Sequence, residues 1–269
     1  VGESVRQFML TLWNTYSFWV LYANAEGLTP ADSAPPADLT DLDRWALSRL
    51  QATVATVRDR MDDFDCTTAG RAIADFVEEL SNWYVRLSRR RFWDGDRAAF
   101  ATLRHCLLET AALLAPFVPF LADEIHLNLT HGADPAVDGP ISADIRGKSA
   151  RRPLDSVHLR DYPVPDPALA EPELEAAMEA VRLTVELGRA ARSQAKAKVR
   201  QPLRRAVIVA NDAEREAIAA RAALVTAELN VKELDFVSDE GELVRYSAKP
   251  NYRTLCPRFG KRMPQVAAA

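Results

Sequence analysis

Apolar positions in the first half of the chain repeat with the period of an α-helix. Residues 39–63 and 67–93 each carry a stripe of apolar side chains at spacings of three and four, which predicts two long helices that bury one face. Thr40 or Asp41 can cap the first, and Thr67 or Thr68 the second. The predicted helices cover residues 3–25, 39–63, 67–93, 97–115 and 117–130. Five helices with short joins predict an antiparallel bundle.

The pattern changes after residue 131. Residues 131–166 are rich in Gly, Pro and Asp, which predicts a long excursion containing one extended segment, SVHLRDYP at 156–163. A long helix over 173–199, ended by Pro202, follows. It leads into the β-type runs RAVIVA (205–210), VKELDFV (231–237) and ELVRYS (242–247), with a helix over 212–230 between the first two. The fold class predicted is mainly α. A helical bundle in residues 1–165 precedes a domain of residues 166–269, made of the long helix and a small α+β unit.

Composition excludes several classes of protein. Hydrophobic residues make up 48% of the chain and charged residues 27%, with a formal net charge of −4, as in globular proteins with a real core. No run of apolar residues is long enough to cross a membrane, and the aromatic-rich N-terminal run is interrupted by polar residues, unlike a signal peptide. The chain opens without Met in the middle of an amphipathic pattern, so we expect a piece of a longer protein.

No catalytic or metal-ligating residue is predicted. The three cysteines are far apart and form no CxxC pair, and the four histidines fit no metal-binding spacing. Neither a G-x-S-x-G sequence nor a phosphate-binding glycine loop occurs. Isolated cysteines of this kind are typical of a reducing compartment, and the expected location is the cytoplasm.

The stretch SNWYVRLSRRRFW, residues 81–93, combines aromatic and arginine side chains. Leu80, Tyr84 and Leu87 continue the core-facing stripe, and Trp83 and Tyr84 are expected mainly in the core. On a helix, Asn82, Arg86, Arg89 and Trp93 are spaced four, three and four, so they share a different face. Guanidinium and indole groups on one face suit single-stranded RNA. The alternative is that the aromatics only pack and the arginines form a solvated helix end that the helix dipole favours.

Two further regions concentrate positive charge. Residues 180–205 include eight basic residues and one acidic residue. Four of the basic residues are spaced three, four and four along the chain: Arg189, Arg192, Lys196 and Arg200. The last block, RYSAKPNYRTLCPRFGKR, interleaves six bases with aromatics and contains no acid. Complementation of the helix dipole would explain the first region but not the last. Local basic faces on an acidic chain favour nucleic-acid binding, and no helix-turn-helix or zinc-finger pattern points to DNA.

Several blocks resemble one family. SNWYVRLSRRRFW is similar to the signature helix of the anticodon-binding domain in the isoleucyl-tRNA synthetase family. Other blocks resemble other segments of the same family and occur in the family's order along the whole chain: LWNTYSFWVLYA, LDRWALSRL, LLAPFVPFLADEIH, SVHLRDYP, KVRQPL and KPNYRTLCPRFGK. The chain carries the K-P-N tail and no four-cysteine zinc module, which resembles the eukaryote-like type found in some bacteria. It departs from the family at Cys256, where Gly is usual.

The resemblance implies the C-terminal part of such an enzyme: the helical anticodon-binding domain and the following junction domain. Its expected partners are isoleucine tRNA and the catalytic and editing domains of the same parent chain, in a cytoplasmic monomer with no membrane contact. No cofactor is expected here, because ATP and Mg²⁺ would serve the parent's catalytic domain. The valyl or leucyl relative, or a helical scaffold for an acidic protein partner, stays an alternative.

The resemblance and the helical spacing together assign three groups of RNA-binding residues. The anticodon loop is assigned to Asn82, Arg86, Arg89, Arg90 and Trp93. The RNA backbone is assigned to Arg189, Arg192, Lys196 and Arg200. Support for anticodon recognition is assigned to Lys249, Arg253, Arg258 and Lys261.

Overall fold

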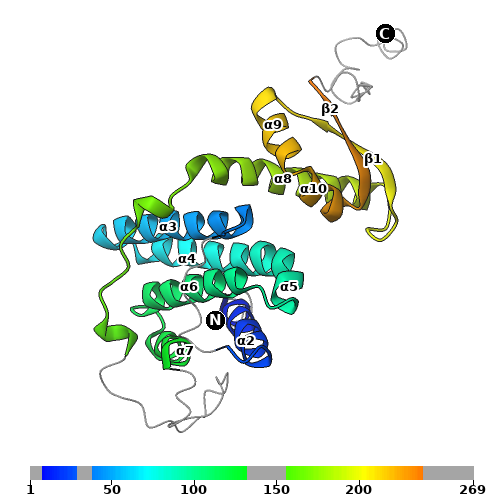
Figure 1. The fold of residues 1–269 in the computed structure, drawn as a ribbon. Helices are drawn as coiled ribbons and strands as arrows, with labels where there is room; N and C mark the ends of the chain where they lie inside the picture. The colour runs from blue at the N-terminus through cyan, green and yellow to red at the C-terminus, as the bar shows by residue number, and fades with distance from the viewer. Residues whose placement is uncertain (1–7, 29–37, 132–155, 239–269) are drawn as a thin grey trace, which may run out of the picture. The chain divides into compact units, whose positions relative to one another are not determined.

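The computed structural model describes residues 8–28, 38–131 and 156–238 (Figure 1). The chain divides into two compact units, Val1–Ala176 and Ala177–Ala269. This division falls inside helix α8 (Pro172–Gln194), whereas the sequence pattern placed the boundary between residues 165 and 166.

Unit 1 is a bundle of helices, in agreement with the predicted fold class. Its helices are α2 (Leu10–Ala25), α3 (Asp41–Asp62), α4 (Cys66–Glu79), the π-helix η3 (Leu80–Val85), α5 (Arg86–Trp93), α6 (Arg97–Leu114) and α7 (Pro119–His131). Helices α3, α4 and α6 lie side by side in the bundle (Figure 1). The segment 156–163 was predicted as extended. It instead contains the 3-10 turn η4 (Val157–Leu159), since the Ser156 hydroxyl caps this turn at the His158 amide.

Side-chain caps fix where these helices begin. Thr40 forms a capping box with Asp43 at the start of α3, as one of the two predicted caps. Helix α4 is capped by Asp65, whose carboxylate accepts from the Thr68 amide. The predicted caps Thr67 and Thr68 were therefore wrong, because the helix starts earlier than the apolar pattern shows.

The core of unit 1 is built around Phe92. Its ring meets Phe18 of α2 and Phe100 of α6 edge-on, with centroid distances of 5.1 and 5.0 Å. The Trp19 indole donates to the Phe100 carbonyl at 2.9 Å, so the buried indole keeps a partner. Full burial of one such aromatic contributes about 1.5–3 kcal/mol, and Phe92 thereby holds the end of α5 against α2 and α6.

Helices α4, η3 and α5 form one continuous helical segment with a π-helical middle. The sequence predicted an uninterrupted α-helix here. Trp83, Tyr84 and Val85 are all buried, although three consecutive residues of an α-helix span about 200° around its axis. A π-helical turn holds more residues than an α-helical turn, which changes the phase of the residues that follow it.

The first turn of α8 is fixed to the bundle by charged residues. Arg49 of α3 contacts Glu79 at 3.0 Å and Glu175 at 3.1 Å. The Ser48 hydroxyl donates to Glu175 and accepts from the Glu171 amide. A short 3-10 turn, η5 (Pro167–Leu169), leads into this turn.

Unit 2 contains a two-stranded parallel sheet. Strand β1 (Leu203–Val209) pairs with β2 (Val231–Val237) in a register that runs from Leu203↔Val231 to Val209↔Val237. The helices α9 (Asp212–Ala220) and α10 (Ala222–Leu229) form the crossover that parallel strands require. Strand β2 matches its prediction, and the α+β class of the second region is confirmed.

Two predicted helices of this unit differ from the structure. Helix α8 ends at Gln194 and not at Val199, and the helix predicted over 212–230 is broken at Arg221, whose φ of −118° is not helical. The predicted strand 242–247 lies outside the described residues. Among the residues that the structure describes, no helix is long and apolar enough to cross a membrane.

Candidate nucleic-acid interface at the end of helix α5

The side chains of residues 89–93 (RRRFW), at the end of α5, lie in three different environments. Arg89, Arg90 and Trp93 are exposed, with 92% of the Arg90 side chain and 74% of Trp93 open to solvent. We call these three residues the α5 end face. Phe92 lies in the core, and Arg91 turns toward the start of α3 and of α6.

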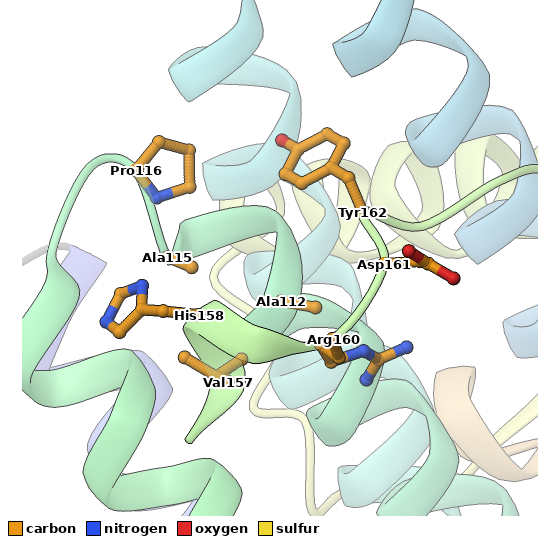
Figure 2. Close-up of a pocket in the computed structure, with 8 residues that line it drawn as sticks. All are labelled: Ala112, Ala115, Pro116, Val157, His158, Arg160, Asp161 and Tyr162. Carbon is orange, nitrogen blue, oxygen red and sulfur yellow. The ribbon is translucent and has the colours of Figure 1, made fainter. Parts of the chain in front are cut away.

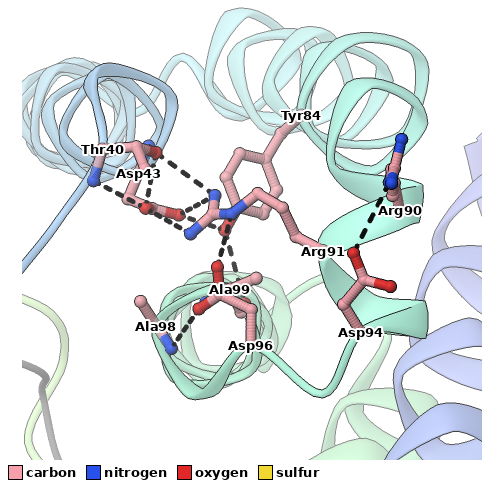
Figure 3. Close-up of polar contacts among 9 residues, drawn as sticks. All are labelled: Thr40, Asp43, Tyr84, Arg90, Arg91, Asp94, Asp96, Ala98 and Ala99. Atoms are coloured by element: carbon pink, nitrogen blue, oxygen red, sulfur yellow. Dashed lines mark hydrogen bonds and ion pairs between the residues drawn. The ribbon is translucent and has the colours of Figure 1, made fainter.

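Arg91 binds Asp43 and Asp96 and thereby joins three helix ends (Figure 3). We call these three residues the clasp. The Arg91 guanidinium donates two hydrogen bonds to the Asp43 carboxylate, at 2.8 and 2.9 Å, and a third to Asp96 at 2.7 Å. Asp96 also caps α6 by accepting from the amides of Ala98 and Ala99. A bidentate guanidinium–carboxylate pair fixes direction as well as distance, so the last turn of α5 has a defined orientation.

Asp43 is a buried carboxylate whose oxygens accept hydrogen bonds from several groups. Besides Arg91, it accepts from the Tyr84 hydroxyl at 2.6 Å and from the Thr40 hydroxyl and amide at 2.6 and 2.9 Å. Burial alone would raise the pKa of Asp43, but the hydrogen bonds from Arg91, Thr40 and Tyr84 outweigh it and hold the pKa below its ordinary value. Burial and the charge of Asp43 raise the pKa of Tyr84, so its hydroxyl stays a donor.

Arg90 has the opposite environment to its neighbour. Its guanidinium lies 3.6 Å from Asp94 at the helix end and points away from the clasp in Figure 3. Such an exposed pair contributes little to stability, so Arg90 is available to a ligand at little cost.

Asn82 and Arg86 stand at the π-helical turn. The Arg86 guanidinium donates to the Asn82 carbonyl at 2.7 Å and lies 5.6 Å from the centroid of the buried Trp83 ring. Asn82 is exposed but sits within η3, so the α-helical spacing that grouped it with Arg89 and Trp93 holds only from Arg86 onward. The expected core positions of Trp83 and Tyr84 are confirmed.

The second predicted group does not form the helical stripe that its spacing implied. Arg189 is paired with Glu228 at 2.5 Å, and Arg192 is only 5% exposed, with its guanidinium on backbone carbonyl groups. Lys196 and Arg200 are exposed but follow the end of α8. The predicted helical spacing of these four residues was wrong because α8 ends before Lys196 and Arg200. The third group, Lys249, Arg253, Arg258 and Lys261, lies outside the described residues.

A pocket of about 220 Å³ lies between the end of α6 and residues 157–162 (Figure 2). Two of its polar side chains are engaged: Arg160 pairs with Glu109 at 2.7 Å, and the Tyr162 hydroxyl donates to the Leu113 carbonyl. No group of three or more His, Cys, Asp or Glu side chains in the described residues could hold a metal ion.

Two structural residues of the site, Arg91 and Asp43, were missed by sequence reasoning. Arg91 looked like a third member of an arginine run, yet its partner Asp43 is 48 residues away in the sequence. The only local signal is the Thr40–Asp43 capping pattern, which places a carboxylate at a helix start but does not say what binds it. The remaining exposed groups, two guanidinium ions and an indole on a clamped helix end, can bind phosphate and stack on unpaired bases.

Comparison with known proteins gives the class. The family described as the anticodon-binding domain of tRNA ligase matches residues 43–208, more than half of the chain and including all of the α5 end face. The chain belongs to this family.

Within that class, the similar full-length proteins are isoleucine–tRNA ligases. The enzyme of Dehalococcoides mccartyi is 45% identical over 87% of this chain. Those of Thermus thermophilus and Thermobifida fusca are 40% and 43% identical over 100% and 99% of it. The chain spans only 22%, 25% and 24% of the length of these relatives. The resemblance found in the sequence blocks is thereby confirmed.

Proposed function

We propose that this chain binds the anticodon stem-loop of isoleucine tRNA as part of an isoleucine–tRNA ligase. The observation that carries the proposal is the α5 end face: two exposed guanidinium groups and one exposed indole on a helix end that Arg91 and Phe92 hold in place. Large aromatic side chains are normally buried, and an exposed Trp93 beside arginines is therefore suited to stacking on a base.

The proposed mechanism uses unstacked bases of the loop. Trp93 and the guanidinium planes of Arg89 and Arg90 stack on bases or bind phosphate, and Asn82 and Arg86 lie earlier on the same helical segment. The clasp keeps this surface ordered before RNA arrives, which reduces the conformational entropy lost on binding. In the parent enzyme this binding would help place the acceptor end at a catalytic domain, which is where ATP and Mg²⁺ are expected.

Two variants of the α5 end face test the proposal. Arg89→Ala combined with Arg90→Ala, and separately Trp93→Ala, should each weaken isoleucine tRNA binding by about 1–3 kcal/mol. Helix content by circular dichroism should not change, because these side chains are exposed. Arg71→Ala, an exposed arginine on α4, is the matched control and should bind like the unaltered chain. Unchanged affinity in both end-face variants would show that the stretch is only structural.

A further inference from the structure

The connection between α8 and β1 is a basic loop with a tightly held backbone. We call residues 195–202 the 195–202 loop. Buried Arg192 donates to the carbonyl groups of Lys198, Gln201 and Asn230, each at 3.0 Å. A guanidinium that satisfies three carbonyls in a fixed geometry ties both halves of the loop to the start of β2.

Asn230 holds the same loop from its other side. Its backbone adopts the left-handed conformation, with φ of 49°, and its side-chain amide donates to the Val199 carbonyl at 3.0 Å. The Asn230 carbonyl accepts from Leu203 as well as from Arg192. Polar backbone groups of the loop therefore bond inward, while Lys196, Lys198 and Arg200 are exposed.

The charges of the loop are not neutralised by the described residues around it. No acid occurs between Glu186 and Asp212. Two nearby carboxylates are already occupied, Glu228 by Arg189 at 2.5 Å and Asp235 by Arg205 at 2.8 Å. Within the described ranges, Lys196, Lys198 and Arg200 form no ion pair, so three cations stand together on a fixed backbone.

Lys196 occupies a position where glycine is the favoured residue. It follows the end of α8 with φ of +53°, and the Ala197 amide returns to the Arg192 carbonyl at 2.9 Å, as in a helix C-terminal cap. The left-handed conformation is unfavourable for a residue with a Cβ atom. Lysine here lowers stability relative to glycine, and what it adds is an exposed positive charge.

We infer that the 195–202 loop is a preorganised site for the phosphate backbone of RNA, in which Lys196, Lys198 and Arg200 contact phosphates and Arg192 and Asn230 are positioning residues. This inference rests on the proposed function, and it includes Lys198, which sequence spacing did not single out. Phosphate contacts strengthen binding without reading bases. An RNA is favoured over an acidic protein because the family match, residues 43–208, includes the whole loop.

Lys196→Gly separates stability from binding. The variant should melt at the same temperature as the unaltered chain or up to about 4 °C higher, because glycine suits this conformation. It should nevertheless bind tRNA less tightly, with the dependence of log K on log salt reduced by about 0.7–0.9. A variant that binds tRNA as tightly as the unaltered chain would overturn the role of Lys196.

A matched pair of double variants tests the loop as a whole. Lys198→Gln with Arg200→Gln should weaken binding about 5–20-fold and reduce the salt slope by about 2. The loss should be equal for isoleucine tRNA and for bulk tRNA, unlike changes at the α5 end face. Arg60→Gln with Arg71→Gln removes the same charge from α3 and α4 and should have little effect. Equal behaviour of the two double variants would overturn the inference.

Arg192 is tested by a double-mutant cycle. Arg192→Gln should weaken tRNA binding when Lys198 and Arg200 are present. It should have no further effect in the Lys198→Gln, Arg200→Gln background, because Arg192 acts by positioning these two basic residues. The same additional loss in both backgrounds would show that Arg192 only supports the fold.

If the unaltered chain bound no tRNA, the proposed function would fail together with the inference. If the chain bound tRNA but polyglutamate displaced it by binding Lys196, Lys198 and Arg200, only the assignment of the loop to RNA would fail.

Discussion

Arg90 and Arg91 are neighbours in the sequence and differ in almost every physical respect. Arg90 is nearly fully exposed beside Asp94, and Arg91 is one-fifth exposed between Asp43 and Asp96. Arg91 keeps Asp43 ionised in the core, since loss of the guanidinium would leave a buried charge without its principal partner. These two adjacent residues therefore have different roles: Arg90 is available to bind a ligand, and Arg91 holds the helix end in position.

This difference predicts opposite results for one substitution at two positions. Arg91→Ala should lower the free energy of unfolding by about 3 kcal/mol, measured by urea denaturation followed by tryptophan fluorescence. Arg90→Ala is the control and should change it by no more than about 0.5 kcal/mol. Equal losses in the two variants would contradict the clasp.

The apolar pattern predicted which aromatic side chains are buried, but it did not show the distant partners of the buried polar groups. Tyr84 was expected in the core because it continues the apolar stripe, Trp83 was also expected there, and both are buried. Arg91 and Arg192 were treated as members of basic runs. Arg91 binds Asp43, which is 48 residues away, and Arg192 binds the carbonyl group of Asn230, which is 38 residues away. No local pattern in the sequence specifies these two contacts.

Element boundaries show a similar division between local and tertiary causes. Strand β2 was predicted with its bounds from the alternation of residues 231–237. Helix α8 ends at Gln194 although helix formers continue to Val199, since Arg192 and Asn230 bind the backbone of the 195–202 loop in another conformation. The π-helical turn at 80–85 has no simple periodic signature, because it arises where Trp83, Tyr84 and Val85 are all buried.

Packing of α8 against α10 depends on the absence of a side chain at Gly188. A Cβ atom on Gly188 would lie 2.6 and 2.7 Å from the two methyl carbons of Leu229. Gly188→Ala should therefore destabilise unit 2 by about 1–3 kcal/mol, although alanine is the better helix former by about 1 kcal/mol.

Two further variants make that test specific, with stability measured by urea denaturation. Leu229→Ala removes the obstructing methyl groups, so Gly188→Ala should be less destabilising in that background than alone. Ala191→Gly, at an exposed position of the same helix, should cost about 1 kcal/mol through helix propensity only. A stabilising Gly188→Ala would show that the Leu229 side chain moves aside without loss of packing.

At the scale of the molecule, net charge is a poor guide to the partner. The chain carries a formal charge of −4, yet several of its acids are bound to its own arginines, as at Asp43, Glu175 and Glu228. Among the exposed basic residues, Arg89 and Arg90 lie together on the α5 end face, and Lys196, Lys198 and Arg200 lie together in the 195–202 loop. Local charge and not the total determines the attraction of an anionic polymer.

We propose that the chain distinguishes isoleucine tRNA from other tRNAs through its anticodon loop. The most direct measurement is the equilibrium affinity of the 269-residue chain for isoleucine tRNA and for the same tRNA with its anticodon bases replaced, each over a range of salt concentrations. We expect binding that weakens with salt in both cases and is at least about tenfold tighter for the natural anticodon, since each lost base contact is worth about 1–3 kcal/mol. Equal affinity for the two RNAs, or a salt slope near zero, would contradict recognition of the anticodon loop.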